Sequence, residues 1–354
     1  MEISLVLSSI ALLLVVINSL TIKVVRNSPS KIDEFVSILI PMRNEEKNID
    51  DCIKSALGQI GLSNFEVIAL DDNSSDSTRQ QLSKFTSVKV LDGKPLPDSW
   101  LGKSWAAHQL AAISGGKYLV FIDADVRLSK FAVASAINAM DKWDFISPYP
   151  KQITNGFLQR LFQPLLQWSW LSSVPLLISQ QFGVKSMAVA NGQFFIVKKD
   201  AYLSSGGHKA VKSEVLDDLM LAKQLLKSGF KGGVAEGSNV AECHMYQSGI
   251  EMIKGYQKSL WRAFGSIFGT LFIIVILFLS SVLPFVLAIS GSETALIGFA
   301  LIVLSRVVSS LRTGALPNTA LLHPFAILIL FCLITYSWFG KLTGNLTWRD
   351  RSVI

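Results

Sequence analysis

Two aspartates separated by one residue, Asp123 and Asp125, directly follow an apolar run at 118–122. Because side chains alternate along an extended chain, both carboxylates would point to the same side. Two hard oxygen ligands placed in this way suit Mg²⁺ or Mn²⁺ shared with the phosphates of a substrate. This spacing also occurs in ordinary solvated loops, so the preceding apolar strand is what gives the pair its weight.

Other acids also follow apolar runs. Asp71 and Asp72 come after a strand-like segment, and a helix cap there would explain one acid but not an adjacent pair. Glu45 follows an earlier segment, where Asn44 as an N-cap with acids in the first helical turn is the simpler interpretation.

A third acidic pair, Asp217 and Asp218, opens a helical pattern that carries Leu219, Ala222 and Leu226 on one face. Such a helix would aim its first-turn acids toward a cleft. The alternative is that both acids only favour the helix dipole, as first-turn acids commonly do.

The elements that would position these residues alternate between strand-like and helical patterns. The strand-like runs are 36–40, 65–70, 88–91 and 118–122, and helical patterns cover 44–57, 77–85 and 104–113. This order predicts an α/β fold with a mostly parallel sheet, in which ligands bind at the carboxyl ends of the strands. The acids that follow strands stand at such ends.

An apolar run at 3–22 is long enough to cross a bilayer as a helix. Lys23, Arg26 and Lys31 come after it, which favours a cytoplasmic side for the residues that follow. A signal peptide would carry its positive charge before the apolar run and a small-residue cleavage site after it. We therefore interpret the run as a membrane anchor.

Three further apolar spans lie at 267–289, 295–311 and 320–339, each long enough or nearly long enough to cross. If all three cross, the C-terminal segment with Lys341, Arg349 and Arg351 ends outside, against the positive-inside tendency. Either one span is short, re-entrant or interfacial, or the rule is broken; the sequence leaves both open, as it does the number of spans.

Residues 157–182 are apolar, yet Arg160, Gln163 and Gln167 form one polar stripe at helical spacing. With the interface-seeking Trp168 nearby, this predicts an amphipathic helix lying on the membrane. A buried helix hairpin is the alternative, since periodicity separates the two poorly.

Composition narrows the class of protein. Half of the 354 residues are hydrophobic and the formal charge is +7, but no basic run is interleaved with aromatic residues, so nucleic-acid binding is not indicated. Anionic lipids or a diphosphate explain the positive charge better. The three cysteines show no disulfide or zinc spacing, which favours a reducing compartment for the globular part.

Five segments in order resemble family 2 of the glycosyltransferases, inverting enzymes with a GT-A nucleotide-sugar domain. The segments are SILIPMRNEE (37–46), VIALDDNSSDST (67–78), WLGKSWAA (100–107), FIDAD (121–125) and LDDLMLA (216–222). Within the family, the WLGK segment, the basic loop, the acid pair and the trailing membrane spans look like the branch that glycosylates carotenoid acids or is associated with hopanoids. The resemblance implies a Rossmann-like GT-A domain.

The resemblance also implies roles for individual residues. Asp72 would bind the uracil of a UDP donor, Lys103 would lie near the diphosphate, Asp123 would meet the ribose or sugar, and Asp125 would hold Mg²⁺ or Mn²⁺. Glu45 belongs to the first donor-binding segment.

The late acid pair would supply the catalytic base, which falls on Asp218. The family usually has Glu-Asp here, so Asp217 departs from the pattern and is kept as a lesser candidate. Independently, an inverting attack by a hydroxyl needs a carboxylate to take its proton.

Trp261 ends a segment similar to the QxxRW signature of processive polysaccharide synthases, but Leu260 replaces the arginine. This departure disfavours a polymerase, and Trp261 could be only an interface anchor. We keep it as a candidate substrate-binding residue. A catalytically inactive relative that binds nucleotide sugar or lipid is a further alternative.

The sequence thus predicts a multi-pass enzyme of the cell membrane that moves a sugar from a nucleotide-sugar donor to a lipid or isoprenoid acceptor. Its expected parts are a transmembrane anchor at 1–26, a cytoplasmic GT-A domain at 32–265 with the interfacial helix 157–182, a transmembrane region at 266–340 and a basic tail at 341–354.

Overall fold

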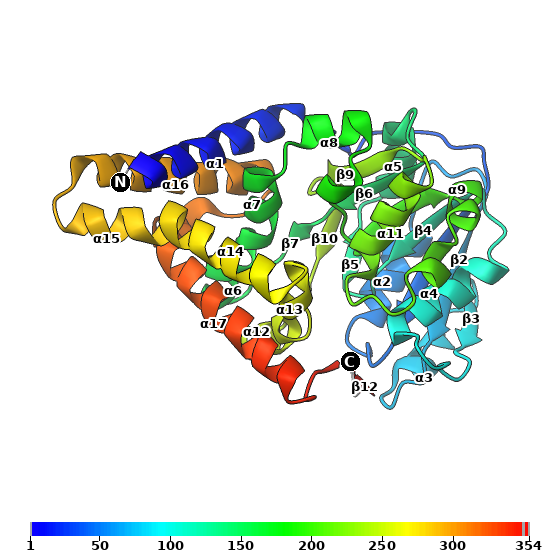
Figure 1. Cartoon of the computed structure of the whole chain (residues 1–354). Helices are drawn as coiled ribbons and strands as arrows, with labels where there is room; N and C mark the ends of the chain where they lie inside the picture. Colours follow the sequence, from blue (N-terminus) through cyan, green and yellow to red (C-terminus); the bar gives the residue numbers. More distant parts are fainter. Residues whose placement is uncertain (1, 349–350, 353–354) are drawn as a thin grey trace. The chain divides into compact units, whose positions relative to one another are not determined.

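The computed structural model describes residues 2–348 and 351–352 (Figure 1). The chain divides into two compact units. A sheet unit comprises Ile22–Lys151 and Ile178–Met245, and a helical unit is built from the described parts of 1–21, 152–177 and 246–354.

The sheet unit contains a seven-stranded sheet with the order β3-β2-β1-β4-β8-β6-β9. Its strands are β1 (Val36–Met42), β2 (Phe65–Asp71), β3 (Lys89–Asp92), β4 (Tyr118–Ile122), β6 (Phe145–Tyr149), β8 (Phe194–Lys198) and β9 (Gly232–Glu236). The pairs β1–β2, β1–β4, β2–β3 and β6–β9 are parallel, whereas β8 runs antiparallel to both β4 and β6. The predicted α/β fold with a mostly parallel sheet is confirmed.

Helices α2 (Ile49–Leu57), α3 (Thr78–Leu82), α4 (Gly102–Ile113), α5 (Ala132–Met140), α9 (Lys199–Ser204), α10 (Gly207–Ala210) and α11 (Asp217–Lys227) belong to this unit, with the 3₁₀ turn η1 (Lys185–Met187). The predicted helical patterns end within a residue or so of α2 and α4. The first pattern began too early, because residues 44–48 form a loop before α2.

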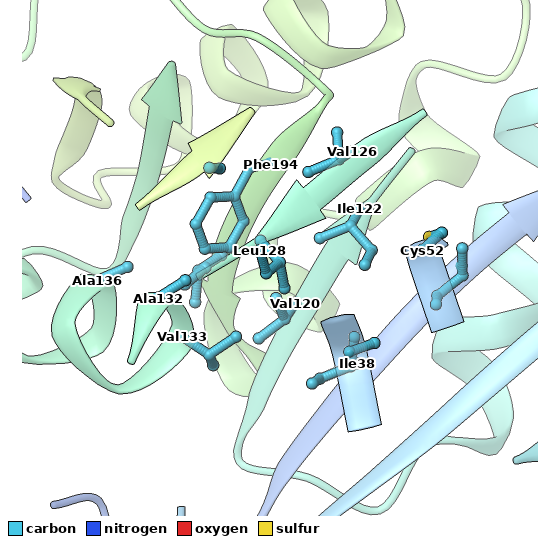
Figure 2. Packing of buried hydrophobic residues seen from close by; sticks show 14 of the residues in the cluster. Ile38, Cys52, Val120, Ile122, Val126, Leu128, Ala132, Val133, Ala136 and Phe194 are labelled. Atoms are coloured by element: carbon cyan, nitrogen blue, oxygen red, sulfur yellow. The ribbon is translucent and has the colours of Figure 1, made fainter. Parts of the chain in front are cut away.

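Alternation along the strands creates two apolar cores. Ile38 and Ile40 pack into one cluster with α2 and α5, while Leu39 between them packs into the other with α4 and α11. In Figure 2, Ile38, Val120 and Phe194 come from three strands and meet in the first cluster. A sheet buried on both faces needs apolar residues at successive positions, which is why these strands read as continuous apolar runs.

A small sheet lies at the end of β4. Strand β5 (Val126–Leu128) pairs antiparallel with β10 (Ala241–Cys243), so that Val126 stands opposite Cys243. The N–H of His244 then donates to the carbonyl oxygen of Asp125 at 2.9 Å. The chain near residue 243 is thereby held against the paired aspartates. The short β7 (Lys151–Gln152) and α8 (Leu176–Phe182) span the points where the chain passes from one unit to the other.

The helical unit contains α1 (Glu2–Thr21), α6 (Phe157–Phe162), α7 (Pro164–Ser173), α12 (Gly249–Gln257), α13 (Leu260–Ala263), α14 (Ile267–Leu277), the π-helical turn η2 (Phe278–Val282), α15 (Leu283–Ile289), α16 (Glu293–Arg312), the 3₁₀ turn η3 (Pro317–Leu322) and α17 (His323–Leu342). Four segments are long and apolar enough to cross a membrane, namely Glu2–Thr21, Ile267–Ile289, Glu293–Arg312 and Pro317–Leu342. Figure 1 shows α1 alongside α16. The four apolar segments expected from the sequence are thus helical.

The segment 157–182 forms three short helices instead of the expected one. Gln163 and Gln167, which were expected to form a water-facing stripe, are buried. The indole N–H of Trp168 donates to Ser305 Oγ at 2.9 Å, so this side chain packs inside the helical unit. A location at the membrane surface stays a prediction for this segment.

A buried asparagine fastens α1 within this unit. Asn18 donates to the carbonyl oxygens of Leu171 and Val174, and its own side-chain oxygen accepts from the N–H of Leu176. Three hydrogen bonds explain why a polar residue is tolerated in an apolar helix. The expected basic tail lies in part outside the described residues. Short strands β11 (Thr347–Trp348) and β12 (Arg351–Ser352) pair within it.

Candidate functional site

The candidate site lies at one edge of the seven-stranded sheet. Strands β1, β2 and β4 are parallel and end at this edge, and the antiparallel β8 begins there, with Phe194 opposite Ile122. Residues that directly follow the first three strands and those that precede β8 therefore gather at the same edge, as expected for an open α/β sheet.

A pocket opens at this edge, with about 340 Å³ of empty space that includes part of its open mouth. Its lining residues are Pro41, Lys103, Ala107, Phe121, Ile122, Asp123, Gly192, Phe195, His208, Asp217, Asp218 and Leu221. The pocket thus brings together four of the predicted site residues from three separate parts of the chain: Lys103, Asp123, Asp217 and Asp218. Its apolar wall comes from the sheet and from α4 and α11.

Lys103 lies in the first turn of α4 and reaches the carboxylate of Asp123. Its Nζ is 2.6 Å from Oδ1 and 2.9 Å from Oδ2 of Asp123. Burial by itself would lower the pKa of Lys103, but the carboxylates of Asp123, Asp217 and Asp218 outweigh it and raise that pKa. Lys103 is therefore a permanent positive charge among three carboxylates.

Asp218 connects the start of α11 to the loop before β8. Its Oδ2 accepts from the N–H of Gly192 at 2.6 Å, and its Oδ1 accepts from the N–H of Leu219 at 2.7 Å. Each carboxylate oxygen keeps a further lone pair. Leu221 and Leu225 are buried against the sheet and fix the helix that presents this acid.

Gly192 is needed for close approach. A Cβ there would lie 3.1 Å from Asp218 Cβ and 3.3 Å from Lys103 Nζ, which is tighter than ordinary contact. Sequence reasoning did not assign Gly192 to the site. The only signal available was a glycine just before a strand.

Asp125 lies next to the pocket residues along the chain. Its Oδ1 is buried and has no hydrogen-bond partner in the part of the chain that the structure describes. Burial, followed by the charge of Asp123, raises the pKa of Asp125 to about 6, against the opposing effects of Lys103 and of a hydrogen bond with Cys243. A buried carboxylate oxygen without a partner suits a cation.

The donor set fits Mg²⁺ or Mn²⁺ only if a substrate completes it. Among the described residues, no group of three or more histidine, cysteine, aspartate or glutamate side chains could hold a metal ion. Mg²⁺ is commonly held by one or two carboxylates together with substrate phosphates and water. Asp125 is the residue here that could serve in this way.

The loops after β1 and β2 hold the remaining predicted donor residues. Arg43 donates from Nη1 to the carbonyl oxygens of Asp72 and Asn73 at 2.6 and 2.8 Å, which ties the two loops together. The carboxylate of Asp72 is buried, and its backbone N–H donates to the carbonyl oxygen of Met42. The neighbouring Asp71 contributes a buried Oδ1 that lacks a hydrogen-bond partner among the described residues.

Glu45 lies in the first of these loops. Its Oε2 accepts from Asn48 Nδ2 at 2.8 Å, and its N–H donates to Thr78 Oγ1. Neither Glu45 nor Asp72 is among the residues that line the pocket.

Trp261 lies in the helical unit. Its N–H donates to Ser337 Oγ at 2.9 Å, and Lys341 Nζ stands 3.7 Å from the ring centroid. Trp338 packs edge-on against it. These contacts tie α13 to α17.

His208 lines the pocket, although no spacing pattern singled it out. Burial lowers its pKa to about 3, so the ring is neutral, and Nδ1 lies 2.9 Å from the hydroxyl of Tyr202. The ring therefore contributes shape and a polar edge to the pocket wall, not a charge.

Comparisons with known proteins indicate a glycosyltransferase. Residues 37–203 match the model of glycosyl transferase family 2. The predicted resemblance to family 2 is confirmed.

Two curated relatives give a more specific comparison than the family model does. The chain is 27% identical over 240 residues to a 4,4'-diaponeurosporenoate glycosyltransferase of Staphylococcus haemolyticus, covering 64% of this chain and 60% of that protein. It is 25% identical over 335 residues to the protein of the same name from Staphylococcus aureus strain USA300, covering 89% and 87%. These relatives carry the name of the carotenoid-acid branch that the sequence resembles.

Among solved structures, the mannosyltransferase PcManGT from Pyrobaculum calidifontis, in complex with GDP-Man and Mn²⁺, superposes with a TM-score of 0.51. The identity is 16%, and the likeness covers 99% of both chains. It shows that the two proteins share a fold, and it confirms the expected GT-A architecture with apolar helices at both ends.

Proposed function

We propose that this chain is an inverting glycosyltransferase that moves a sugar from a nucleotide diphosphate donor to a lipid or isoprenoid acceptor at the membrane. The observation that carries the proposal is the pocket in which Lys103 meets Asp123, Asp217 and Asp218 at the carboxyl edge of the sheet. A lysine at this position can pair with the negative charge of a diphosphate, and the acids around it can bind hydroxyls and accept a proton.

The donor would bind along the strand ends. Asp72 binds the nucleobase and Glu45 supports the loop around it, while Asp123 accepts hydrogen bonds from ribose or sugar hydroxyls. Lys103 stands at the N-terminus of α4, where backbone N–H groups also attract anions, so this point suits the diphosphate. UDP is the nucleotide that the family resemblance favours.

Binding of this donor must rearrange the ion pair. Both oxygens of Asp123 face Lys103 at hydrogen-bond distance. The diphosphate would pair with Lys103 in place of part of the Asp123 carboxylate. Lone pairs of Asp123 would then be free to accept hydrogen bonds from the donor's hydroxyls.

A divalent cation, Mg²⁺ or Mn²⁺, would be held by Asp125 together with the donor phosphates. When bound, such a cation neutralises the charge that develops on the departing diphosphate. The buried Oδ1 of Asp125, which has no hydrogen-bond partner among the described residues, supports this assignment. The Mn²⁺ that accompanies GDP-Man in the Pyrobaculum mannosyltransferase supports a divalent metal here as well.

Asp218 would take the proton of an acceptor hydroxyl as the sugar's anomeric carbon is attacked from the side opposite the diphosphate. Two backbone N–H groups fix its orientation and leave lone pairs for the proton. Asp217, its neighbour on the pocket wall, is the second candidate.

The chemistry of the acceptor decides whether a base is needed. The name of the staphylococcal relatives denotes a carboxylate, which is already deprotonated and attacks without a base. A lipid hydroxyl, in contrast, must lose its proton as the glycosidic bond forms. Dependence on Asp218 therefore distinguishes the two acceptor classes.

The four apolar helices support a multi-pass protein of the cell membrane. We place the sheet unit on the cytoplasmic side because Lys23, Arg26 and Lys31 follow the first span. A nucleotide sugar would then arrive from the cytoplasm and the acceptor from the bilayer.

The direct test is release of UDP by purified full-length protein from a panel of UDP-sugars, with Mn²⁺ or with EDTA, and with lipid acceptors that end in a hydroxyl or a carboxylate. Metal-dependent release that requires an acceptor supports the transferase, and single-sugar products distinguish it from a processive synthase. Tight donor binding without turnover on any acceptor would instead favour an inactive binding relative.

A further inference from the structure

An arginine is buried inside the helical unit without an acidic partner among the residues that the structure describes. Arg306 lies near the C-terminal end of the apolar helix α16, and its side chain is only 1% exposed. Arginine stays protonated in proteins, so its charge must be compensated in place. A buried charge without a partner is strongly unfavourable.

The Nη2 atom of the Arg306 guanidinium has a hydrogen-bond partner at a break between two helices. Pro164 lacks an N–H, so the helical hydrogen-bond pattern is interrupted between α6 and α7. Arg306 Nη2 donates to the carbonyl oxygen of Leu161 at 2.9 Å, and Thr319 Oγ1 donates to that of Arg160. These two bonds satisfy carbonyls at the end of α6 and tie it to α16 and η3.

The Nη1 atom of the same guanidinium has no such partner among the described residues. Nη1 of Arg306 is buried and has no hydrogen-bond partner within residues 2–348 and 351–352, and no ion pair of Arg306 occurs there. The acids of the described part of this unit, Glu2, Glu251 and Glu293, stand in the first turns of α1, α12 and α16. Glu293 is about 20 Å from Arg306 along the helix axis.

A second buried side chain in this region also lacks partners. Gln163, two residues after Leu161, is fully buried, and neither its amide oxygen nor its amide nitrogen has a partner in the described chain. The Nε atoms of Arg160 and Arg312 are likewise buried without a partner there. Arg306 and Gln163 belong to segments that are joined directly, because Arg306 binds the carbonyl oxygen of Leu161 at the end of α6, two residues before Gln163.

We propose that Arg306, together with Gln163, binds the oxyanion head of an amphipathic lipid-like ligand, a carboxylate or a phosphate, inside the helical unit. The apolar helices around this point suit the ligand's hydrocarbon chain, and an ionisable residue within an apolar span commonly marks a ligand site. A planar guanidinium matches the two oxygens of such a head group. The proposal goes beyond the transfer reaction and does not depend on it.

Two sources could supply this chemistry: a carboxylate-ended isoprenoid and an anionic phospholipid of the bilayer. The test therefore uses full-length protein in phosphatidylcholine nanodiscs, with radiolabelled retinoate and retinol as isoprenoids that differ in their head group. A second set of nanodiscs contains phosphatidylglycerol, and lipids retained by the protein are identified by native mass spectrometry.

The variants are Arg306→Gln, which removes the charge, Arg306→Lys, which keeps it, and Arg262→Gln as a matched control at an exposed arginine of the same unit. We expect the wild type to bind retinoate at least tenfold more tightly than retinol, or to retain phosphatidylglycerol selectively. Arg306→Gln should abolish that preference, Arg306→Lys should keep part of it, and Arg262→Gln should leave it unchanged. Retinoate preference identifies an isoprenoid carboxylate, and retained phosphatidylglycerol identifies a bilayer lipid.

The proposal is overturned if the wild type neither distinguishes retinoate from retinol nor retains phosphatidylglycerol, a comparison that needs no variant. It is also overturned if Arg306→Gln, folded by its thermal unfolding curve, keeps the wild-type preference. Because the readout is binding, failure of this site is distinguishable from absence of transferase activity.

Discussion

The replacement Asp218→Asn probes the proposed base and has two effects that the structure separates. Both carboxylate oxygens of Asp218 accept a backbone N–H, from Gly192 at 2.6 Å and from Leu219 at 2.7 Å. An asparagine has one oxygen and one NH₂ group, so its NH₂ must face one of these two donors. One charge-assisted hydrogen bond is lost, which costs about 1.5–3 kcal/mol of local stability.

The catalytic effect should be larger than this structural one. A positioned general base typically contributes about 10²- to 10⁴-fold to the rate. With a hydroxyl acceptor, we expect kcat to fall by about that factor while the donor dissociation constant changes by less than about tenfold, since removing a base affects the transition state and not donor binding. With a carboxylate acceptor, the fall should be much smaller.

The assay is UDP release at saturating donor concentration for both acceptor types. Donor binding is measured by calorimetry, and unfolding is followed as a function of temperature. Asp217→Asn is the matched control, because this neighbouring acid also lines the pocket. Wild-type rates on a hydroxyl acceptor in a folded Asp218→Asn protein would refute the role of Asp218 as base. A larger loss for Asp217→Asn would move that role to Asp217.

Four further predictions concern the pocket residues and the neighbouring Asp125. Asp125→Asn should make the donor affinity measured by calorimetry the same with Mn²⁺ as with EDTA, because the buried oxygen that suits the cation loses its charge. In the wild type, Mn²⁺ affinity should weaken about tenfold per pH unit as the pH falls below about 6, because protons compete with the metal for Asp125. Burial and the charge of Asp123 raise the pKa of Asp125 to about 6. A flat affinity profile between pH 7 and 5 would contradict this. Lys103→Ala should weaken UDP-sugar binding by about 10- to 100-fold with less effect in Lys103→Arg, because a charged contact to the diphosphate is lost. Gly192→Ala should lower kcat by about 10- to 100-fold in a folded protein. The added Cβ would lie 3.1 Å from Asp218 Cβ and 3.3 Å from Lys103 Nζ, so both groups must move. An unchanged kcat would show that the placement of these two groups is not critical.

Local patterns were sufficient to predict much of the sheet unit. The strands buried on both faces are short apolar runs, and the acids after β2 and β4 stand at strand ends because the chain leaves the sheet there. Helix α11 begins at Asp217, as its periodicity indicated. The antiparallel direction of β8 was not predictable in this way, since a strand's own residues do not fix its direction relative to its neighbours.

The polar stripe at Gln163 and Gln167 illustrates the limit of periodicity. The spacing showed that these residues share one side of a helix, but not whether that side faces water or protein. In the structure they are buried, and Arg306 from a distant helix binds the carbonyl of Leu161 nearby. What a helix face packs against is decided by segments far away in the chain.

The sequence by itself determined the α/β class, the apolar spans and the types of residue available for chemistry, because alternation, helical period and segment length are local properties. Only the tertiary structure decided which of them meet. Lys103, Asp123, Gly192 and Asp218 lie in or directly beside four different elements. Strands β4 and β8 pair within the sheet, and α4 and α11 bury their apolar residues against it, which brings these side chains together. The burial that unites the elements also sets the charge balance of the pocket, and no local pattern encodes that balance.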